Sequence, residues 1–277
     1  MTVKRRRYGR TGHGYTVDGS KVPGVTTILG DTLPKDGLTD WAARCGADEV
    51  IDYWDELAEL LPSERHQRVH FAYRHDRDAA AKRGTEVHRI AEALNDWTEG
   101  DPDIPVPDEL AGHVEAYQDF LDTIRPTAVE GGTELVVANR TLRYCGTADL
   151  VADLGPLSAG DEAIPACRWL LELKTTRSGI WPESALQACA YFHAEVFVDP
   201  AQPDDERPMD WLQIERCGVV WIKSDAWELR PVDTGPATWD YFQHLRWLYD
   251  HNDDKPGWIG MTADPAFPAE LVAADRP

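Results

Sequence analysis

The spacing of apolar residues changes from a helical to a strand period at Pro126. Before this proline, apolar residues recur every three or four positions, at 110, 114, 117, 120, 121 and 124. This spacing predicts an amphipathic helix that ends at Pro126. After it, apolar and polar residues alternate, which predicts strands over residues 133–138, 143–153 and 168–175, followed by a helix over 182–198. The order of these patterns predicts an α/β fold.

The chain is expected to form a single domain over residues 1–252, followed by a tail. Residues 1–30 would form a basic arm and a hairpin, residues 31–126 a helical subdomain, and residues 127–252 the core. Residues 253–277 are rich in Pro, Asp and Ala without any period, so no regular structure is expected there.

Local signals define the elements within these parts. Asp18-Gly19, between two alternating segments, predicts the turn of the hairpin. Three helices are expected between residues 38 and 97, the last of them over 85–97. Near the end of the core, the patterns predict strands over 217–223 and 227–232 and a closing helix over 236–251.

The composition indicates a globular protein, because apolar residues make up 42% of the 277 residues and suffice for a packed core. No apolar run is long enough for a membrane span or a signal peptide, so we expect a cytoplasmic location and no membrane partner. The five cysteines are scattered and include no CxxC pair, which predicts neither a disulfide framework nor a zinc or iron–sulfur cluster.

Charge is distributed unevenly along the chain. The net charge, 28 − 49 = −21, speaks against a nucleic-acid partner on its own, because phosphate binding depends on Lys and Arg. Residues 1–24, however, carry six basic residues and one acid, 6 − 1 = +5, and residues 65–83 form a second basic segment. By contrast, residues 45–64 contain seven acids and no base, as expected of a solvated helix face. We expect the basic segments to hold a DNA backbone, the first of them through Arg5, Arg6 and Arg7.

Two apolar strand segments contain charged residues, and these residues suggest the chemistry. Asp149 lies in the first segment, and Glu172 and Lys174 lie in the second. Alternation along a strand places Glu172 and Lys174 on the same face. Two carboxylates and an ammonium at one edge of a sheet suit phosphodiester hydrolysis, in which the carboxylates hold one or two Mg²⁺ or Mn²⁺ ions and the lysine offsets transition-state charge. The alternative is a buried salt bridge that supports the sheet.

Two helical segments add polar pairs at i, i+4 spacing. His88 and Glu92 share one face among apolar neighbours, so a neutral His88 imidazole could bind a metal, with Glu92 as a secondary candidate beside it. Gln187 and Tyr191 share a face of the next helix after Glu172, and both could donate hydrogen bonds to phosphate oxygens. The plainer alternatives are a core histidine, and a packed tyrosine beside a solvated glutamine.

In sequence order, the segments RGTEVH, GTADLV, ELKTT and QACAY resemble the RecB-like branch of the PD-(D/E)xK nuclease superfamily, which includes phage exonucleases with a QxxxY motif. The matching segments are spread over residues 22–191. The resemblance implies a restriction-endonuclease-like core, a mixed twisted sheet flanked by helices, with an N-terminal helical subdomain. Ala148 stands where the superfamily name has Pro. The cysteines that hold an iron–sulfur cluster in some relatives are missing, which implies a nuclease that uses metal ions alone.

The resemblance also implies a role for each matching residue. The implied metal ligands are His88, Asp149, Glu172 and the Leu173 carbonyl. The implied catalytic residues are Asp149, Glu172 and Lys174. Gln187 and Tyr191 would position the DNA strand, and Glu134, in the strand before Asp149, is implied as a secondary residue near the metal.

The expected function is therefore that of a Mg²⁺- or Mn²⁺-dependent deoxyribonuclease. The main expectation is an exonuclease that processes DNA ends in recombination or repair, with a single-strand annealing protein as its partner. A structure-specific or site-specific endonuclease is the alternative within the same superfamily. A non-enzymatic acidic DNA mimic is a third alternative, and only the net charge favours it. The sequence argues against it, because a mimic needs surface carboxylates and not carboxylates inside strands.

Overall fold

The computed structural model describes residues 2–8, 12–34, 36–95, 104–176 and 179–251. The end of the helix expected over 85–97 and the expected tail lie outside the described residues. The backbone of Arg6 and Arg7 is described, but their side chains are not.

A small antiparallel sheet precedes the first helix. In the described residues it contains β1 (Val3–Tyr8), β2 (Gly12–Val17) and β3 (Ser20–Val22). The hairpin predicted at Asp18-Gly19 is confirmed, since β2 pairs with β3 and both turn residues have positive φ, 50° and 80°. The basic segment expected as an arm instead forms β1, paired with β2 along its length. This strand was not predicted, because its consecutive charged residues do not alternate with apolar ones, as strand residues usually do.

The described chain forms four helices between residues 36 and 95, one more than expected in this stretch. The described part of the chain has α1 (Val25–Thr32), α2 (Asp36–Asp52), α3 (Trp54–Glu59), α4 (Pro62–His70) and α5 (Ala72–Asn95). The prediction of three helices after residue 38, the last beginning at residue 85, is therefore wrong. The first half of α5 is composed mostly of charged and small residues, so no apolar stripe marks it in sequence. None of the described helices is long and apolar enough to cross a membrane.

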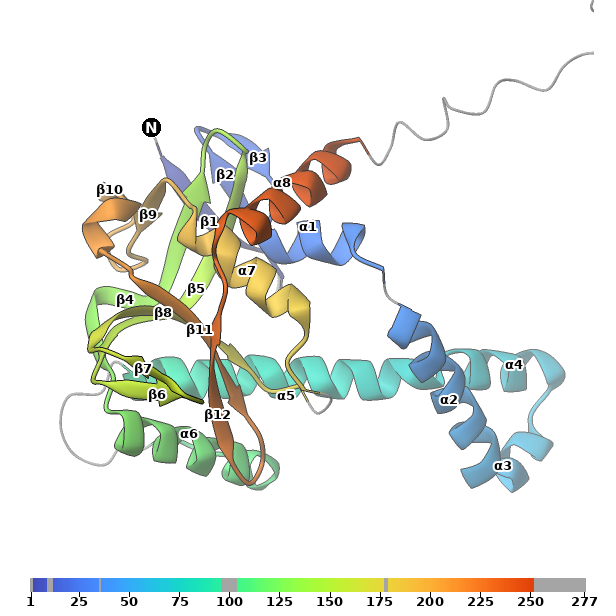
Figure 1. Ribbon diagram of the computed structural model, residues 1–277. Helices are drawn as coiled ribbons and strands as arrows, with labels where there is room; N and C mark the ends of the chain where they lie inside the picture. Colours follow the sequence, from blue (N-terminus) through green and yellow to red (C-terminus); the bar gives the residue numbers. More distant parts are fainter. Residues whose placement is uncertain (1, 9–11, 35, 96–103, 177–178, 252–277) are drawn as a thin grey trace, which may run out of the picture.

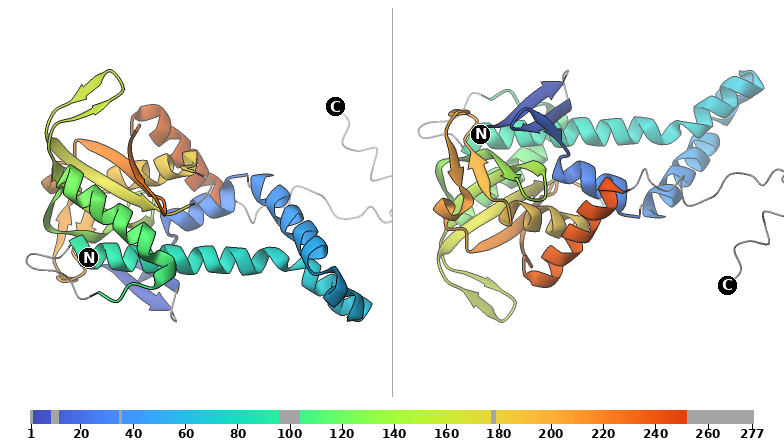
Figure 2. Two further views of the ribbon diagram at one scale, coloured as in Figure 1. Left: turned by 90° about the horizontal axis from the view of Figure 1, so that it is seen from below. Right: turned by 90° about the horizontal axis from the view of Figure 1, so that it is seen from above.

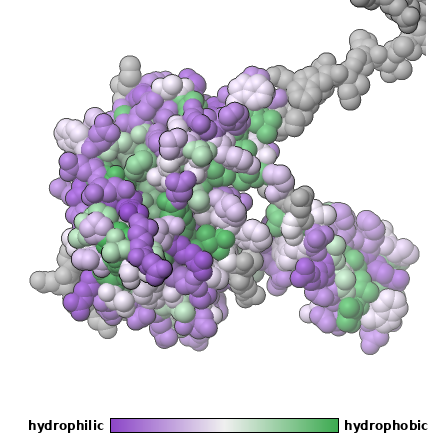
Figure 3. Space-filling view, viewed as in Figure 1, coloured by the Kyte–Doolittle hydropathy of each residue, from purple (hydrophilic) through white to green (hydrophobic). Residues whose placement is uncertain are grey.

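Helices α2, α3 and α4 and the start of α5 project from the rest of the molecule as a helical arm (Figures 1 and 2). Among the side chains described in this arm, only Leu57 is buried. Figure 3 shows apolar surface on the arm, and its large apolar side chains that are exposed are Leu38, Ile51, Tyr53, Trp54 and Leu61. The arm therefore contributes little to the hydrophobic core of the protein.

Seven strands of the described chain form one mixed, twisted sheet in the order β10-β9-β4-β5-β8-β11-β12 (Figure 1). Their bounds are β4 (Thr127–Asn139), β5 (Tyr144–Leu154), β8 (Cys167–Lys174), β9 (Val196–Val198), β10 (Glu206–Pro208), β11 (Arg216–Ile222) and β12 (Trp227–Val232). Strands β8 and β11 run parallel, and the other pairs of this described sheet are antiparallel. The expected strands after Pro126 and the expected hairpin over 217–232 are confirmed, although β4 begins earlier than predicted. A short hairpin of β6 (Leu157–Ala159) and β7 (Glu162–Ile164) connects β5 to β8.

Helix α7 (Pro182–Phe192) is shorter than the helix expected over residues 182–198. Residues 196–198 instead form β9, which pairs with β4. These residues, Val-Phe-Val, are β-branched or aromatic and suit a strand. The helix was predicted to extend to residue 198 because these apolar residues also fit the helical spacing. Helix α8 (Pro236–Asp250) confirms the expected closing helix to within one residue.

Helices cover both faces of the sheet (Figures 1 and 2). Helix α6 (Ala111–Ile124), preceded by the short 3-10 helix η1 (Asp108–Leu110), packs against β11 and β12 and lies beside α5. Helices α1, α7 and α8 pack together on the other side. Along β8, Leu170 belongs to the core under α7, and Leu171 belongs to the core under α6. Glu172 and Lys174 alternate with Leu171 and therefore turn toward α7.

We expect Gly146→Ala to destabilise the fold, because Gly146 in β5 lies against the Tyr191 ring of α7. A Cβ at Gly146 would lie 2.2 Å from Tyr191 Cε1, well inside van der Waals contact. The expected loss in unfolding free energy is about 1–3 kcal/mol, measured by urea denaturation. Gly155→Ala is the control, since a Cβ there meets no described atom within 4 Å. Equal stability of the two variants would contradict this packing.

Candidate functional site

Strands β5 and β8 separate at the point where both carry acidic residues. Their ladder ends at the pair Leu150–Leu171. Beyond that pair, β5 continues beside β4, and β8 continues beside β11. Asp149 and Glu172 are the first residues past the end of the ladder. We refer to the region between the separated strands as the fork.

Inside the fork, the Asp149 side chain accepts the hydrogen bond that a backbone carbonyl of a neighbouring strand would otherwise accept. The backbone N–H of Leu173 donates a hydrogen bond to Asp149 Oδ2 at 2.7 Å. Because the N–H and C=O of one strand residue point to the same edge, the Leu173 carbonyl also faces the fork. The structure therefore brings Leu173 next to Asp149.

Glu172 and Lys174 meet two polar side chains of α7. Lys174 Nζ donates to Glu172 Oε1 at 2.8 Å and to Gln187 Oε1 at 3.0 Å. Gln187 Nε2 donates to Glu172 Oε1 at 2.6 Å and to the Tyr191 hydroxyl at 2.9 Å. Gln187 and Tyr191 thus share one helix face, but only 6% and 2% of each is exposed. The alternative of a solvated glutamine is therefore wrong.

One oxygen of Glu172 lacks a hydrogen-bond partner. Oε2 is buried, and no described residue hydrogen-bonds to it. Burial and the nearby charge of Asp149 raise the pKa of Glu172 to about 7, against the opposing effect of Lys174. Burial would lower the pKa of Lys174, but Glu172 and Asp149 raise it overall, so the ammonium stays charged. A buried carboxylate with an unpaired oxygen is suited to receive a cation.

His88 reaches Asp149 from α5. Its Nδ1 lies 3.3 Å from Asp149 Oδ1, and the two side chains are 28% and 11% exposed. Burial would lower the pKa of His88, but the Asp149 carboxylate outweighs burial and raises this pKa to about 9. Burial would likewise raise the pKa of Asp149, but His88 lowers it overall. Helix α5 approaches the end of β8 through Gly84, where a Cβ would lie 3.4 Å from Thr175 Oγ1.

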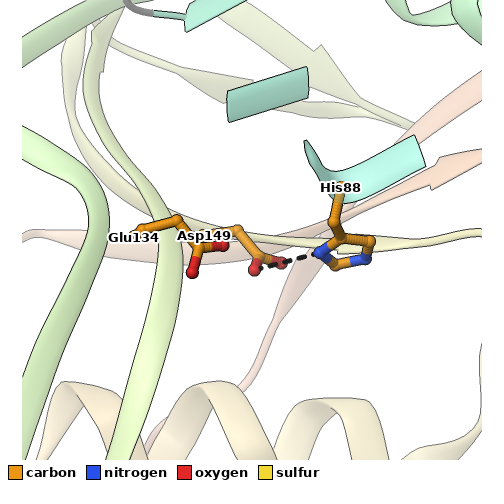
Figure 4. Close-up of side chains that lie close together, drawn as sticks. All are labelled: His88, Glu134 and Asp149. Carbon is orange, nitrogen blue, oxygen red and sulfur yellow. Dashed lines mark ion pairs between the residues drawn. The ribbon is translucent and has the colours of Figure 1, made fainter. Parts of the chain in front are cut away.

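Glu134 joins His88 and Asp149 in a group that could hold a metal ion (Figure 4). One candidate ligand atom from each of the three residues lies within 4.8 Å of the other two. Glu134 and Asp149 come from the adjacent strands β4 and β5, and His88 comes from helix α5. Glu134 Oε2 also accepts a hydrogen bond from Arg5 Nη1 at 2.9 Å. No sequence signal points to this pair, because 129 positions separate its members.

Three arginines of the basic segments contact other parts of the protein itself. Arg5 pairs with Glu134, and Arg68 in the second segment pairs with Glu49 and Glu56. Arg65 donates to backbone carbonyls at residues 57, 58 and 60. These arginines are therefore less available to a DNA backbone than the sequence suggests.

Glu92 lies one helical turn after His88 and is exposed. Burial and Asp149 raise the pKa of Glu134, Arg5 opposes them, and the charge of Glu92 adds to the increase. Glu92 therefore contributes, through its charge, to the raised pKa of Glu134.

Comparisons with known proteins leave the family open. A scan against protein-family models finds no match, and no curated protein matches the sequence. What the fork can do chemically is therefore inferred from the positions of its side chains.

We expect the metal-free protein to lose stability as the pH rises above neutrality. The pKa of His88 is raised from its ordinary value of 6.5 to about 9. Its stabilising contribution is thus complete below about pH 6.5 and is lost as the pH rises through about 9. The contribution is at most about 3–4 kcal/mol, since one pKa unit corresponds to about 1.4 kcal/mol.

This decline is measured by urea denaturation in EDTA between about pH 7.5 and 9.5. The range lies above the pKa of Glu172, so that Glu172 is already largely ionised within it. His88→Gln should flatten the decline, because glutamine does not titrate. An equally steep decline in both proteins would contradict the pairing of His88 with Asp149.

Proposed function

We propose that the protein is a metal-dependent deoxyribonuclease of the PD-(D/E)xK type, close to the RecB-like branch. The observation that carries the proposal is the fork, where Asp149, Glu172 and Lys174 come together with His88. Segments that are far apart in sequence, and that resemble this branch in their order, supply the side chains. A mixed, twisted sheet flanked by helices agrees with the architecture of such a nuclease.

The residues of the fork fit a divalent cation. Carboxylate oxygens and an imidazole nitrogen are suitable ligands for Mg²⁺ or Mn²⁺, and Glu172 Oε2 lacks a partner among the described residues. The resemblance implies that His88, Asp149, Glu172 and the Leu173 carbonyl would hold the ion. Among the described residues, candidate ligand atoms of His88, Glu134 and Asp149 lie within 4.8 Å of one another. A bound Mg²⁺ or Mn²⁺ would lower the pKa of a coordinated water and offset charge on a phosphate.

In this proposal Lys174 contacts the phosphate of the scissile bond. Its side chain is 22% exposed, whereas that of the neighbouring Glu172 is 3% exposed. Hydrogen bonds to Glu172 and Gln187 fix the ammonium in place. A charge that is already oriented stabilises the developing negative charge of the transition state without further reorganisation.

Gln187 and Tyr191 act as positioning residues in this proposal. The resemblance implies that they position the DNA strand, and both are buried in the DNA-free protein. Gln187 contacts Lys174 and Glu172 together, and Tyr191 accepts a hydrogen bond from Gln187. Their burial favours a role in orienting the catalytic pair.

DNA ends are the proposed substrate, and the proposed reaction is exonucleolytic hydrolysis. The acidic-mimic alternative requires carboxylates displayed on the surface, whereas Asp149 and Glu172 are 11% and 3% exposed. The negative net charge is compatible with a DNA substrate, because bound divalent ions invert the local potential.

The proposal is tested with 5′-labelled and 3′-labelled DNA, single-stranded and double-stranded, incubated with Mg²⁺, Mn²⁺ or EDTA. We expect mononucleotides from linear DNA with either metal and no product in EDTA. Covalently closed circular DNA should remain intact, and its cleavage would indicate an endonuclease instead. Intact DNA under all metal conditions would refute the proposal.

We expect Lys174→Ala to lose most of the cleavage activity and to retain metal binding. The missing ammonium should cost about 3–4 kcal/mol of transition-state stabilisation, or about two to three decades in single-turnover rate. Lys223→Ala is the control, because Lys223 pairs with Glu228 outside the fork. This variant should keep the rate within about twofold, as expected for a surface pair.

Thermal unfolding is measured beside cleavage, because Lys174 also pairs with the buried Glu172. A Lys174→Ala protein that melts early yet cleaves at the normal rate while folded would show that the lysine is structural.

A further inference from the structure

Glu134 occupies a strained position directly across from Asp149. Its neighbours Thr133 and Leu135 pair with Leu150 and Ala148, so the residue opposite Glu134 is Asp149. The β4–β5 register shifts just before this point, and Glu134 has a φ of 52°. A left-handed backbone at a residue other than glycine costs on the order of 1–3 kcal/mol and tends to mark functional sites.

Two carboxylates opposite each other on adjacent strands repel each other. An oxygen of Glu134 and an oxygen of Asp149 lie within 4.8 Å of each other, so this repulsion acts at short range. Strained backbone and like charges both oppose the arrangement. The two opposed carboxylates therefore require a positive charge close to Glu134, which offsets their repulsion.

Arg5 supplies that cation from a distant part of the sequence. The Arg5–Glu134 pair has exposed fractions of only 25% and 18%. Strand β1 is held in place by its pairing with β2 and by the packing of Val3 and Tyr15 in a cluster with residues of β4 and β5. Arg5 Nε is buried, and no described residue hydrogen-bonds to it. One N–H of the guanidinium thus has no described hydrogen-bond partner, while another donates to Glu134.

We propose that Arg5 is a built-in counter-cation of the fork, which neutralises Glu134 in the metal-free protein and gives up this carboxylate to a divalent cation. Glu134 is then a ligand of the proposed metal centre, in addition to the set that the resemblance implies. This inference rests on the proposed function only in requiring that the fork binds a divalent ion. Strand β1 thereby sets the affinity of the fork for cations.

The test measures Mn²⁺ binding to the full-length protein without DNA, by isothermal titration calorimetry and by electron paramagnetic resonance of free Mn²⁺. Arg5→Gln should bind Mn²⁺ about tenfold more tightly, because it removes a positive charge that competes for Glu134. Arg5→Lys keeps the charge and should bind Mn²⁺ nearly as the wild type does. Glu134→Gln should bind about tenfold more weakly, and adding Arg5→Gln to it should have a much smaller effect.

A matched control separates this role from a general effect of losing an arginine. Arg140 pairs with Glu206 at similar burial, 19% and 21% exposed, away from the fork. Arg140→Gln should therefore leave Mn²⁺ affinity unchanged.

Thermal unfolding gives a second readout that a purely structural role would not produce. Arg5→Gln should lower the melting temperature in EDTA, because Glu134 and Asp149 then lack one of their cations. Saturating Mn²⁺ should restore it, since the ion supplies the missing charge. A loss of equal size with and without Mn²⁺ would overturn the proposal.

The remaining outcomes separate this inference from the proposed function. If Arg5→Gln binds Mn²⁺ as the wild type does, or more weakly, while the wild type still cleaves DNA, then the counter-cation role of Arg5 is wrong. If Arg5→Gln binds Mn²⁺ more tightly but the wild type leaves DNA intact, the inference stands and the nuclease proposal fails. A wild type that binds no Mn²⁺ would overturn the inference.

Discussion

The separation of β5 from β8 is the constraint on which the rest of the site depends. Because their ladder ends at Leu150–Leu171, the N–H of Leu173 needs another acceptor, and the Asp149 carboxylate supplies it. A ladder continued by one more step would give that N–H a backbone partner and leave Asp149 free to rotate. The end of the ladder thus creates the opening and fixes a carboxylate inside it.

Three cations from separate parts of the chain balance the carboxylates of the fork. His88 of α5 faces Asp149 at 3.3 Å, Lys174 of β8 faces Glu172 at 2.8 Å, and Arg5 of β1 faces Glu134 at 2.9 Å. Burying such carboxylates without partners would cost far more than these pairs contribute. The fork is therefore close to electrical balance in a chain whose net charge is −21.

Sequence patterns predicted the parts of this arrangement that depend on local periodicity. Alternation along one strand suffices to place Glu172 and Lys174 on the same face, and helical spacing suffices to pair Gln187 with Tyr191. Helix α5 was misjudged because its projecting half has no apolar stripe, and α7 because Val196–Val198 suits a helix face and a strand alike. The Arg5–Glu134 pair was not predictable, because it depends on how β1 docks on the sheet and on the left-handed backbone of Glu134.

A fork that protein cations already balance also constrains which ion the proposed centre would accept. An entering ion has to displace the proton of His88, because only the neutral imidazole binds metal, and it has to draw Glu134 away from Arg5. A monovalent ion gains too little from each carboxylate to offset both costs, since its attraction to an oxygen is half that of a divalent ion at the same distance. A small divalent ion interacts with several of these oxygens at once. If the fork binds a metal ion as proposed, the protein's own cations would therefore bias it toward divalent over monovalent ions.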